Sequence, residues 1–221
     1  MPPHTIYIIR HCDKPKNYRK EGPLHPSDCL CNDQGYLRSE LLVNYWSDKI
    51  YQYNNVSLIA SAFSPENPKC SCEQREMLVL LPTAKKFNLP IEMPYCFYQI
   101  KETSDYILNK NGLVIVGFEH KHIKPLIKAL SNIDIHPYPG DRFDLVFKLT
   151  LNNNNKYDLE ITTEKLDLIG DSLELPNYYK KFSNDLKNKF KKVKNNIIKK
   201  ILILILLLIL ILLLIYKLLK K

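Results

Sequence analysis

Strand-like and helix-like segments alternate over residues 1–135, and this alternation limits the fold more than any other feature of the sequence. The strand-like segments are short apolar runs rich in β-branched residues, at Thr5–Ile9, Val56–Ala62 and Leu113–Phe118. Helical stretches follow them at 33–49, 74–87 and 120–131. Such alternation predicts a three-layer α/β/α domain with a mostly parallel sheet covered on both faces.

Local signals refine this prediction. Asn32 is suited to cap the first helix, for which we expect an apolar stripe made of Tyr36, Leu37, Leu41, Leu42, Tyr45 and Trp46. Pro82 should interrupt the second helical stretch, because proline cannot donate a backbone hydrogen bond. Two alternating runs, 142–151 and 156–163, flank the polar turn Asn152–Asn155, and they predict an antiparallel hairpin at the end of the domain.

The segment Ile201–Tyr216 is sixteen residues long and carries no charge. As a helix it would extend roughly 24 Å, and with Lys217–Leu219 it approaches the thickness of a bilayer core of about 30 Å. Flanking lysines can extend their ammonium groups to the membrane surface. An interfacial helix would need a polar face, which this run lacks. We therefore expect a single transmembrane helix at 201–219, a basic linker at 177–200 and a globular domain at 1–176.

The net charge of +9 is concentrated before and after this apolar run. Residues 180–221 hold twelve lysines and one aspartate, so the remainder of the chain is close to neutral. A basic segment beside an apolar helix is typical of contact with anionic lipid head groups. Because aromatic residues do not interleave with the lysines in the manner of a base-stacking surface, we expect a lipid bilayer as a partner and no nucleic acid.

Lysines are more numerous before the apolar run than after it, which favours a domain on the cytosolic side of the membrane. The short span suits a thin bilayer, such as that of the endoplasmic reticulum or the mitochondrial outer membrane. Since no signal peptide precedes the first strand, the cysteines are expected to be reduced thiols. The pairs Cys29/Cys31 and Cys70/Cys72 offer four thiolates for zinc, but one intervening residue is a poor match to zinc-site spacing.

Basic side chains stand where a parallel sheet collects its active site, just beyond the carboxyl ends of strands. Arg10 and His11 end the first strand, His120 follows the third, and Arg75 opens the helical stretch after the second. A single histidine at a strand end often serves only as a hydrogen-bonding group. Two such histidines with two arginines indicate a site for an anion.

These residues also carry a resemblance to a known family. The segment Ile6–Pro15, containing Arg10-His11-Cys12, resembles the Arg-His-Gly signature of the histidine phosphatase (phosphoglycerate mutase-like) superfamily. Phe118-Glu119-His120 resembles the form of the second-histidine motif that reads Trp-Glu-His. Further matching segments are Cys31–Arg38, Arg75 with Pro82 and Ala84, and Tyr138–Val146. The matches lie in family order over residues 4–150.

The resemblance implies a phosphohydrolase without metal or cofactor that acts on a phosphorylated protein or small molecule. His11 would accept the phosphoryl group, and Arg10, Arg75 and His120 would bind its oxygens. The leaving group needs a proton, for which Glu102 is the first candidate, Glu119 the alternative and Asp105 a third. Cys12 replaces the glycine of the signature, so a catalytically inactive, membrane-tethered binding or scaffold protein is the alternative function.

Three other residues are expected to lie outside the site. Arg38, on the first helix, is predicted to face solvent. His122 follows His120 by two helical positions and should point away from the pocket. His25 is expected in a solvated loop.

Overall fold

The computed structural model describes residues 3–15, 29–62, 70 and 74–219, and it leaves undescribed the side chains at 187, 189, 190, 193, 194 and 206–219. A six-stranded sheet, in the order β3-β2-β4-β1-β5-β6, lies at the centre of the first unit of the chain, Met1–Pro176. Strands β1 to β4 run parallel, whereas β5 and β6 form the antiparallel hairpin expected at 142–163. The strands are β1 (Thr5–Arg10), β2 (Val56–Ala60), β3 (Ile91–Glu92), β4 (Leu113–Phe118), β5 (Leu145–Leu151) and β6 (Tyr157–Thr163).

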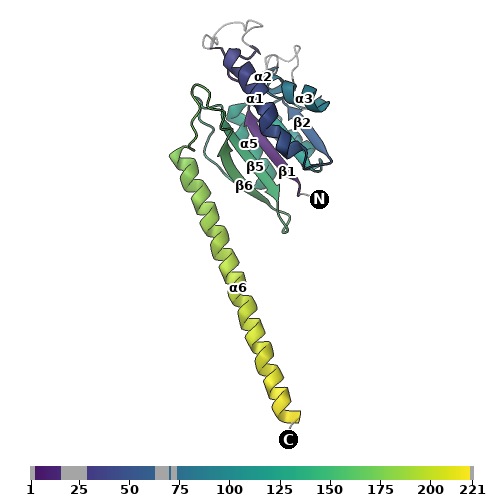
Figure 1. Cartoon of the computed structure of the whole chain (residues 1–221), viewed down its shortest axis with the longest axis vertical. Helices are drawn as coiled ribbons and strands as arrows, with labels where there is room; N and C mark the ends of the chain where they lie inside the picture. Colours follow the sequence, from purple (N-terminus) through teal and green to yellow (C-terminus); the bar gives the residue numbers. More distant parts are fainter. Residues whose placement is uncertain (1–2, 16–28, 63–69, 71–73, 220–221) are drawn as a thin grey trace. The chain divides into compact units, whose positions relative to one another are not determined.

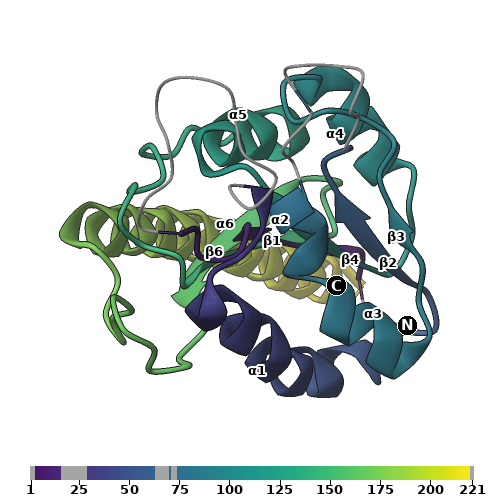
Figure 2. The same ribbon diagram turned by 90° about the horizontal axis from the view of Figure 1, so that it is seen from above.

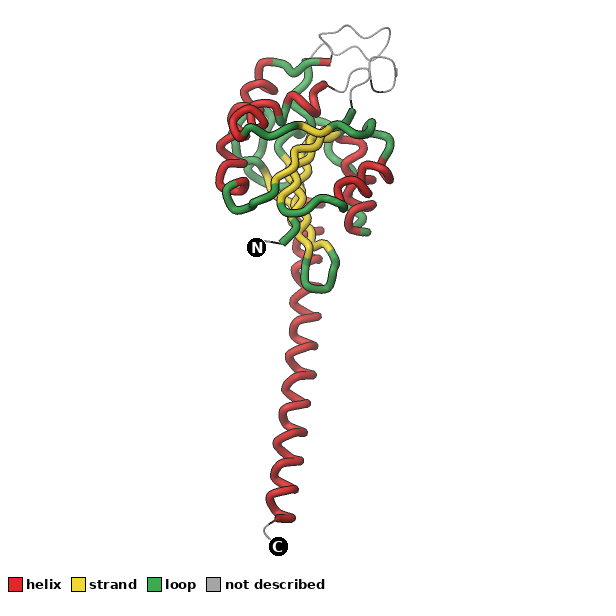
Figure 3. Tube along the Cα trace, turned by 90° about the vertical axis from the view of Figure 1, so that its right-hand side faces the viewer, coloured by secondary structure: helices red, strands yellow, loops and turns green. Residues whose placement is uncertain are grey.

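Helices cover both faces of this sheet, which confirms the predicted layers (Figures 2 and 3). Figure 2 shows α1 and α3 on one face and α4 and α5 on the other. The helices of the first unit are α1 (Asp33–Ile50), α2 (Gln74–Leu78), α3 (Leu81–Phe87), α4 (Ile100–Leu108) and α5 (His120–Ser131). Pro82 stands in the first turn of α3 and separates it from α2, as expected from its missing N–H.

The core on the α1 side begins with side chains from alternate positions of β1. Tyr7 and Ile9 point to this face, where Trp46 packs edge-on against Tyr7 with 5.3 Å between ring centroids. Every residue of β1 and β4 is buried, as expected for central strands covered on both faces. Burial of this kind stabilises each large apolar side chain by about 1.5–3 kcal/mol.

The predicted apolar stripe of α1 is wrong at its amino end. Tyr36 and Leu37 are exposed, and the buried positions of that turn are Gly35, Arg38 and Ser39. These small and polar residues face inward because the first turn of α1 packs against the loop that follows β1, and only later turns reach the apolar core. The helix itself has the expected extent and Asn32 caps it, accepting a hydrogen bond from the Gly35 N–H at 2.7 Å.

The chain separates into two units, Met1–Pro176 and Asn177–Lys221. The second unit contains α6 (Asn177–Leu219), the last helix in Figure 1. In the part of the chain that the structure describes, no helix meets the length and apolarity that a membrane crossing requires. Most of the apolar run that we expected to cross a bilayer, 206–219, lies outside the described side chains, while those of Ile201–Ile205 are exposed.

Candidate active site

The carboxyl ends of β1 and β4 bring the two candidate histidines together. Arg10 and Phe118 are register partners in this parallel pair, and the His11 N–H continues the ladder by donating to the Phe118 carbonyl at 3.0 Å. His120 opens α5 two residues further along. The rings of His11 and His120 consequently lie 5.7 Å apart, centroid to centroid.

His11 is buried and electrically neutral at physiological pH. Burial lowers the pKa of His11 well below its ordinary value of 6.5, and the positive charges of Arg10 and Arg75 lower it further. Its Nδ1 lies 2.8 Å from the Cys12 carbonyl oxygen. Because a carbonyl can only accept, Nδ1 carries the proton and donates it, and Nε2 is left with a free lone pair. This is the tautomer that a nucleophilic histidine requires.

Arg10 lies fully buried beside His11 and holds the loop that contains Gly140 and Arg142. Its Nη1 donates to the carbonyls of Gly140 and Arg142, at 2.8 and 2.6 Å. The guanidinium also stacks on the ring of Phe143, 3.7 Å from its centroid. Within the part of the chain that the structure describes, the buried Nε and Nη2 atoms of Arg10 have no hydrogen-bond partner. Two unused donors on a buried cation are suited to an anion that brings its own oxygens.

Arg75 reaches the same site from α2. Its positive charge acts on both His11 and Arg10, lowering the pKa of each, and its side chain is buried. The helix can approach β4 closely because Gly117 has no side chain: a Cβ there would collide with the Glu76 carbonyl oxygen. Burial lowers the pKa of Arg10 to about 10, so Arg10 remains charged at neutral pH.

Glu119 links the second histidine to the start of α5. Its carboxylate caps the helix by accepting from the backbone N–H groups of Lys121 and His122, at 2.7 and 3.2 Å. It also lies 2.8 Å from the Nδ1 atoms of both His120 and His122. His122 thus contacts the carboxylate beside His120, while its own ring packs against Phe97 with 4.6 Å between ring centroids.

This network keeps Glu119 ionised. Burial opposes ionisation, but hydrogen bonds and charge from His120, with a hydrogen bond from His122, lower the pKa of Glu119 to about 2. Burial lowers the pKa of His120, although its hydrogen bond with Glu119 acts in the opposite direction. Glu119 therefore orients His120 and opposes the lowering of its pKa, and at neutral pH Glu119 has no proton to give a leaving group.

The other candidate acids do not lie in this cluster. Glu102 was expected in a loop, but it stands exposed in the first turn of α4. Asp105, one turn later, is exposed and pairs with Lys101 at 2.6 Å. Of the three candidate carboxylates, the structure brings only Glu119 together with the histidines.

One ligand atom from each of His11, Glu119 and His120 falls within 4.8 Å of the others. Two imidazoles and a carboxylate form a set that zinc can accept. Arg10 and Arg75 place two positive charges at the same point, however, and Glu119 is already shared between two histidines. The electrostatics of the cluster favour an anion over a cation.

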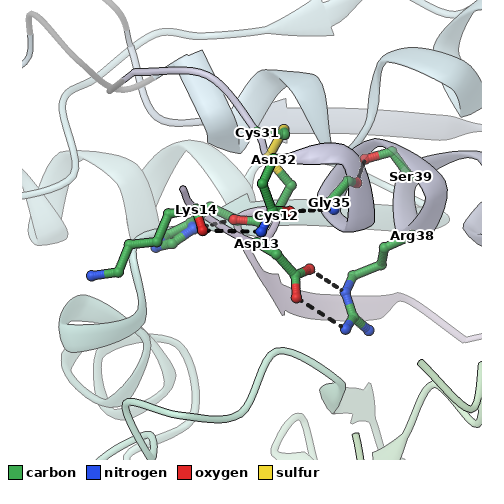
Figure 4. Close-up of a disulfide and its surroundings, with 9 residues drawn as sticks. Cys12, Asp13, Lys14, Cys31, Asn32, Gly35, Arg38 and Ser39 are labelled. Atoms are coloured by element: carbon green, nitrogen blue, oxygen red, sulfur yellow. Dashed lines mark hydrogen bonds and ion pairs between the residues drawn. A yellow bond between two sulfur atoms is a disulfide. The ribbon is translucent and has the colours of Figure 1, made fainter. Parts of the chain in front are cut away.

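The expectation of reduced cysteines is corrected by the structure. Cys12 is bonded to Cys31, and Cys70 to Cys96, with Cα atoms 5.7 and 6.0 Å apart. Cys29 is also disulfide-bonded. A zinc site on the two Cys-x-Cys pairs is thereby excluded, because the sulfurs of Cys31 and Cys70 are bonded to those of Cys12 and Cys96. Figure 4 shows the Cys12–Cys31 bond beside the first turn of α1.

Arg38 is also corrected: it is fully buried and faces inward (Figure 4). It forms ion pairs with Asp13, Glu164 and Asp171 at 2.7, 2.6 and 2.6 Å. Three carboxyl groups accept hydrogen bonds from the buried guanidinium, which the sequence did not indicate because two of them follow it by 126 and 133 positions. His25 lies outside the described residues, as do 64–69 and 71–73 of the segment before Arg75.

No protein-family model matches this chain, and no curated protein matches its sequence. Among solved structures, it is similar to the protein histidine phosphatase SixA complexed with tungstate, with a TM-score of 0.50 and 14% identity over 72% of this chain and 97% of that chain. Weaker similarities include a putative phosphohistidine phosphatase SixA from Agrobacterium tumefaciens (TM-score 0.45, 13% identity, 74% of this chain and 99% of that chain). A mutant phosphoserine phosphatase from Entamoeba histolytica in complex with phosphoserine has a TM-score of 0.45 and 10% identity, over 75% and 100%. The chain therefore shares its fold with this protein histidine phosphatase, which is the fold that the sequence resemblance implied.

Proposed function

We propose that this chain is a phosphohydrolase that cleaves phosphomonoesters through a phosphohistidine at His11. One observation carries the proposal: a neutral, buried histidine with a free Nε2 stands beside a buried arginine whose Nε and Nη2 donors have no partner in the described chain. A phosphoryl group supplies an electrophilic phosphorus for the histidine and oxygens for the arginine.

In the first step, Nε2 of His11 attacks phosphorus and the bond from phosphorus to the ester oxygen breaks. Arg10, Arg75 and His120 compensate for the negative charge on the transferred oxygens, which is the main requirement of this kind of transfer. In the second step, water attacks the phosphohistidine, the bond from nitrogen to phosphorus breaks, and phosphate leaves. The hydrogen bond from Nδ1 to the Cys12 carbonyl holds the imidazole in place during both steps.

Proton supply to the leaving group distinguishes this enzyme from a merely phosphate-binding relative. With Glu119 ionised and Glu102 and Asp105 exposed, none of the three candidate acids offers a protonated carboxyl group beside His11. We infer that esters whose leaving oxygen needs no proton, such as aryl phosphates, are cleaved fastest. The same observation favours the second candidate function, a catalytically inactive protein that binds phosphorylated partners at a membrane.

The test is hydrolysis of p-nitrophenyl phosphate by the full chain in detergent. We expect turnover that falls by on the order of 1,000-fold or more in His11→Ala, together with an acid-labile phosphoprotein that is absent from the variant. His4→Asn is the matched control, because His4 precedes the amino end of β1 and should leave the rate unchanged. Binding of inorganic phosphate without turnover would reject the enzyme in favour of the binding protein.

We also propose that the apolar run at 201–219 tethers the domain to a bilayer, with phosphorylated molecules at that surface as substrates. The support is the uncharged sequence of the run and the lysines on either side of it. Flotation with liposomes tests this: the full chain should float and resist extraction at high pH. A chain in which Leu206, Leu208 and Leu213 are replaced by Lys should remain in the soluble fraction.

A further inference from the structure

The peptide bond between Cys12 and Asp13 carries the carbonyl that sets the tautomer of His11. That carbonyl oxygen lies 2.8 Å from Nδ1 of His11. If the peptide rotated, Nδ1 would lose its acceptor, and the proton could move to Nε2, the atom that must attack phosphorus. The orientation of this one peptide is therefore a condition for a nucleophilic His11.

The structure fixes the peptide from its amino side with a disulfide. Cys12 is buried and bonded to Cys31, which directly precedes Asn32, the cap of α1. Cysteine here fills a position that is glycine in the signature that the segment resembles. A glycine would leave the backbone free to rotate, whereas the disulfide attaches it to a helix.

Asp13 fixes the same peptide from its carboxyl side. Its carboxylate receives Nε of Arg38 at 2.7 Å and Nε2 of Gln34 at 2.9 Å, and its carbonyl accepts from the Asn32 N–H at 2.9 Å. The backbone of Asp13 lies so close to α1 that a Cβ on Gly35 would stand 2.7 Å from the Asp13 oxygen. Figure 4 shows the Asp13 carboxylate facing the guanidinium of Arg38 beside the first turn of α1.

Arg38 is in turn held from the opposite side of the domain. Its Nη1 and Nη2 donate to Glu164, just after β6, and to Asp171, in the segment that follows, both at 2.6 Å. With its side chain fully buried and three carboxylates around it, the guanidinium has no freedom to turn. Asp13 is therefore attached to a rigid ion cluster.

We propose that Arg38 and the Cys12–Cys31 disulfide are positioning groups for His11 that act through the Cys12–Asp13 peptide. Together they keep the Cys12 carbonyl directed at Nδ1 and so keep Nε2 unprotonated. The inference rests on the proposed function for its catalytic consequence. Its structural content, the tautomer of His11, can be measured in a protein without turnover.

The tautomer is read by ¹⁵N NMR of the full chain labelled at its six histidines, with His11→Ala to assign the signal. In the wild type we expect His11 to be neutral with its proton on Nδ1. Asp13→Asn, which keeps an oxygen for Arg38 but removes the charge, and the double variant Cys12→Ala/Cys31→Ala should each give a mixture of tautomers. In both, kcat should fall on the order of 10- to 100-fold with little change in KM, because misplacement of a reacting group costs this much.

Matched controls separate positioning from general loss of stability. Glu92→Gln breaks an ion pair outside this cluster, that of Glu92 with Lys110, and Cys70→Ala/Cys96→Ala removes the other disulfide whose two partners the structure describes. Both should lower the melting temperature yet keep the Nδ1–H tautomer. Arg38→Lys retains a cation beside Asp13, so it should keep more of the Nδ1–H tautomer of His11 than Asp13→Asn keeps.

The inference is overturned if Asp13→Asn and Cys12→Ala/Cys31→Ala fold and keep a pure Nδ1–H tautomer. It is also overturned if the control variants change the tautomer as much as these two test variants do. Failure of the proposed function looks different: the wild type would show the expected tautomer and no phosphatase activity. If the double cysteine variant does not fold, Asp13→Asn and Arg38→Lys decide the outcome alone.

Discussion

At the scale of single residues, the site divides its charges so that the nucleophile stays neutral while its neighbours do not. Arg10 and Arg75 disfavour a proton on His11, and burial acts in the same direction. Glu119 is ionised and stabilises positive charge on His120. A neutral nucleophile beside cationic oxygen-binding groups is the distribution that transfer of an anionic phosphoryl group needs.

The pH dependence of catalysis should reflect the lowered pKa of His11. Activity requires the unprotonated imidazole, so it is lost only as pH falls through the pKa of His11, which lies well below 6.5. We expect kcat/KM for an aryl phosphate, corrected for ionisation of the substrate, to show no loss from His11 between pH 8 and 6.5. An acid limb centred at or above 6.5 that moves in Arg75→Gln would show that His11 is not shielded as described.

Glu119→Gln tests the role of the carboxylate in the second-histidine motif. The amide still caps α5, but the charge that raises the pKa of His120 is gone, so that pKa should fall further below its ordinary value. Because a smaller fraction of His120 is then protonated at neutral pH, kcat/KM should fall by roughly 10-fold. Activity should recover as the pH is lowered. NMR titration of His120 gives the pKa directly; an unchanged value would remove Glu119 from this role. Glu102→Gln, on exposed α4, is the control.

Residue by residue, the sequence indicated the part of the site that depends on strand ends. Arg10, His11 and His120 could be placed together because parallel strands deliver their carboxyl ends to one edge. Arg38 could not, since its acceptors Asp13, Glu164 and Asp171 are 25, 126 and 133 positions away.

At the scale of elements, the strand and helix signals were reliable where apolar residues repeat regularly. β4 and α5 have the predicted bounds. The two-residue strand β3 is too short to leave a pattern, and α4 was taken for a loop because its buried positions include Thr103 and Ser104. The first turn of α1 was misread for a related reason. It packs against the loop that follows β1, and it does so through Gly35, Arg38 and Ser39.

The ion cluster that joins α1 to the end of β6 should make stability depend on pH. Burial raises the pKa of Glu164 to about 8, against the attraction of Arg38. Between the ordinary value of 4.5 and about 8, the folded protein holds a proton that the unfolded chain has lost, so stability falls as pH rises through this window. Glu164→Gln can still accept from Arg38 but cannot ionise, so its melting temperature should decline less than that of the wild type between pH 5 and 9.

Each kcal/mol lost by the wild type should appear as about 2–4 °C in the melting temperature. Glu160→Gln is the control, because Glu160 lies on β6, the strand that directly precedes Glu164, but is exposed and pairs with Lys148. Parallel decline of the wild type and Glu164→Gln with pH would show that Glu164 is ionised throughout, and that the cluster carries the charge of all three carboxylates.

At the scale of the whole molecule, two physical arguments disagree on which side of the proposed membrane the domain would lie. The lysines before the apolar run favour the cytosolic side, as the sequence predicted. The disulfides favour an oxidising compartment, because cytosolic thiols are kept reduced. Cys12–Cys31 gives this conflict a functional consequence, since the bond lies next to His11 and forms one half of its proposed positioning.

We expect the disulfides to prevail, with the domain on an oxidising side. Cells expressing the full chain are lysed in a large maleimide reagent that adds mass to each free thiol. The five cysteines described in the structure are all disulfide-bonded, so before reduction at most one of the six should be labelled. After reduction in denaturant, all six should shift. Labelling of five or six without reduction would place the domain on a reducing side and leave Arg38 alone to hold the Cys12–Asp13 peptide.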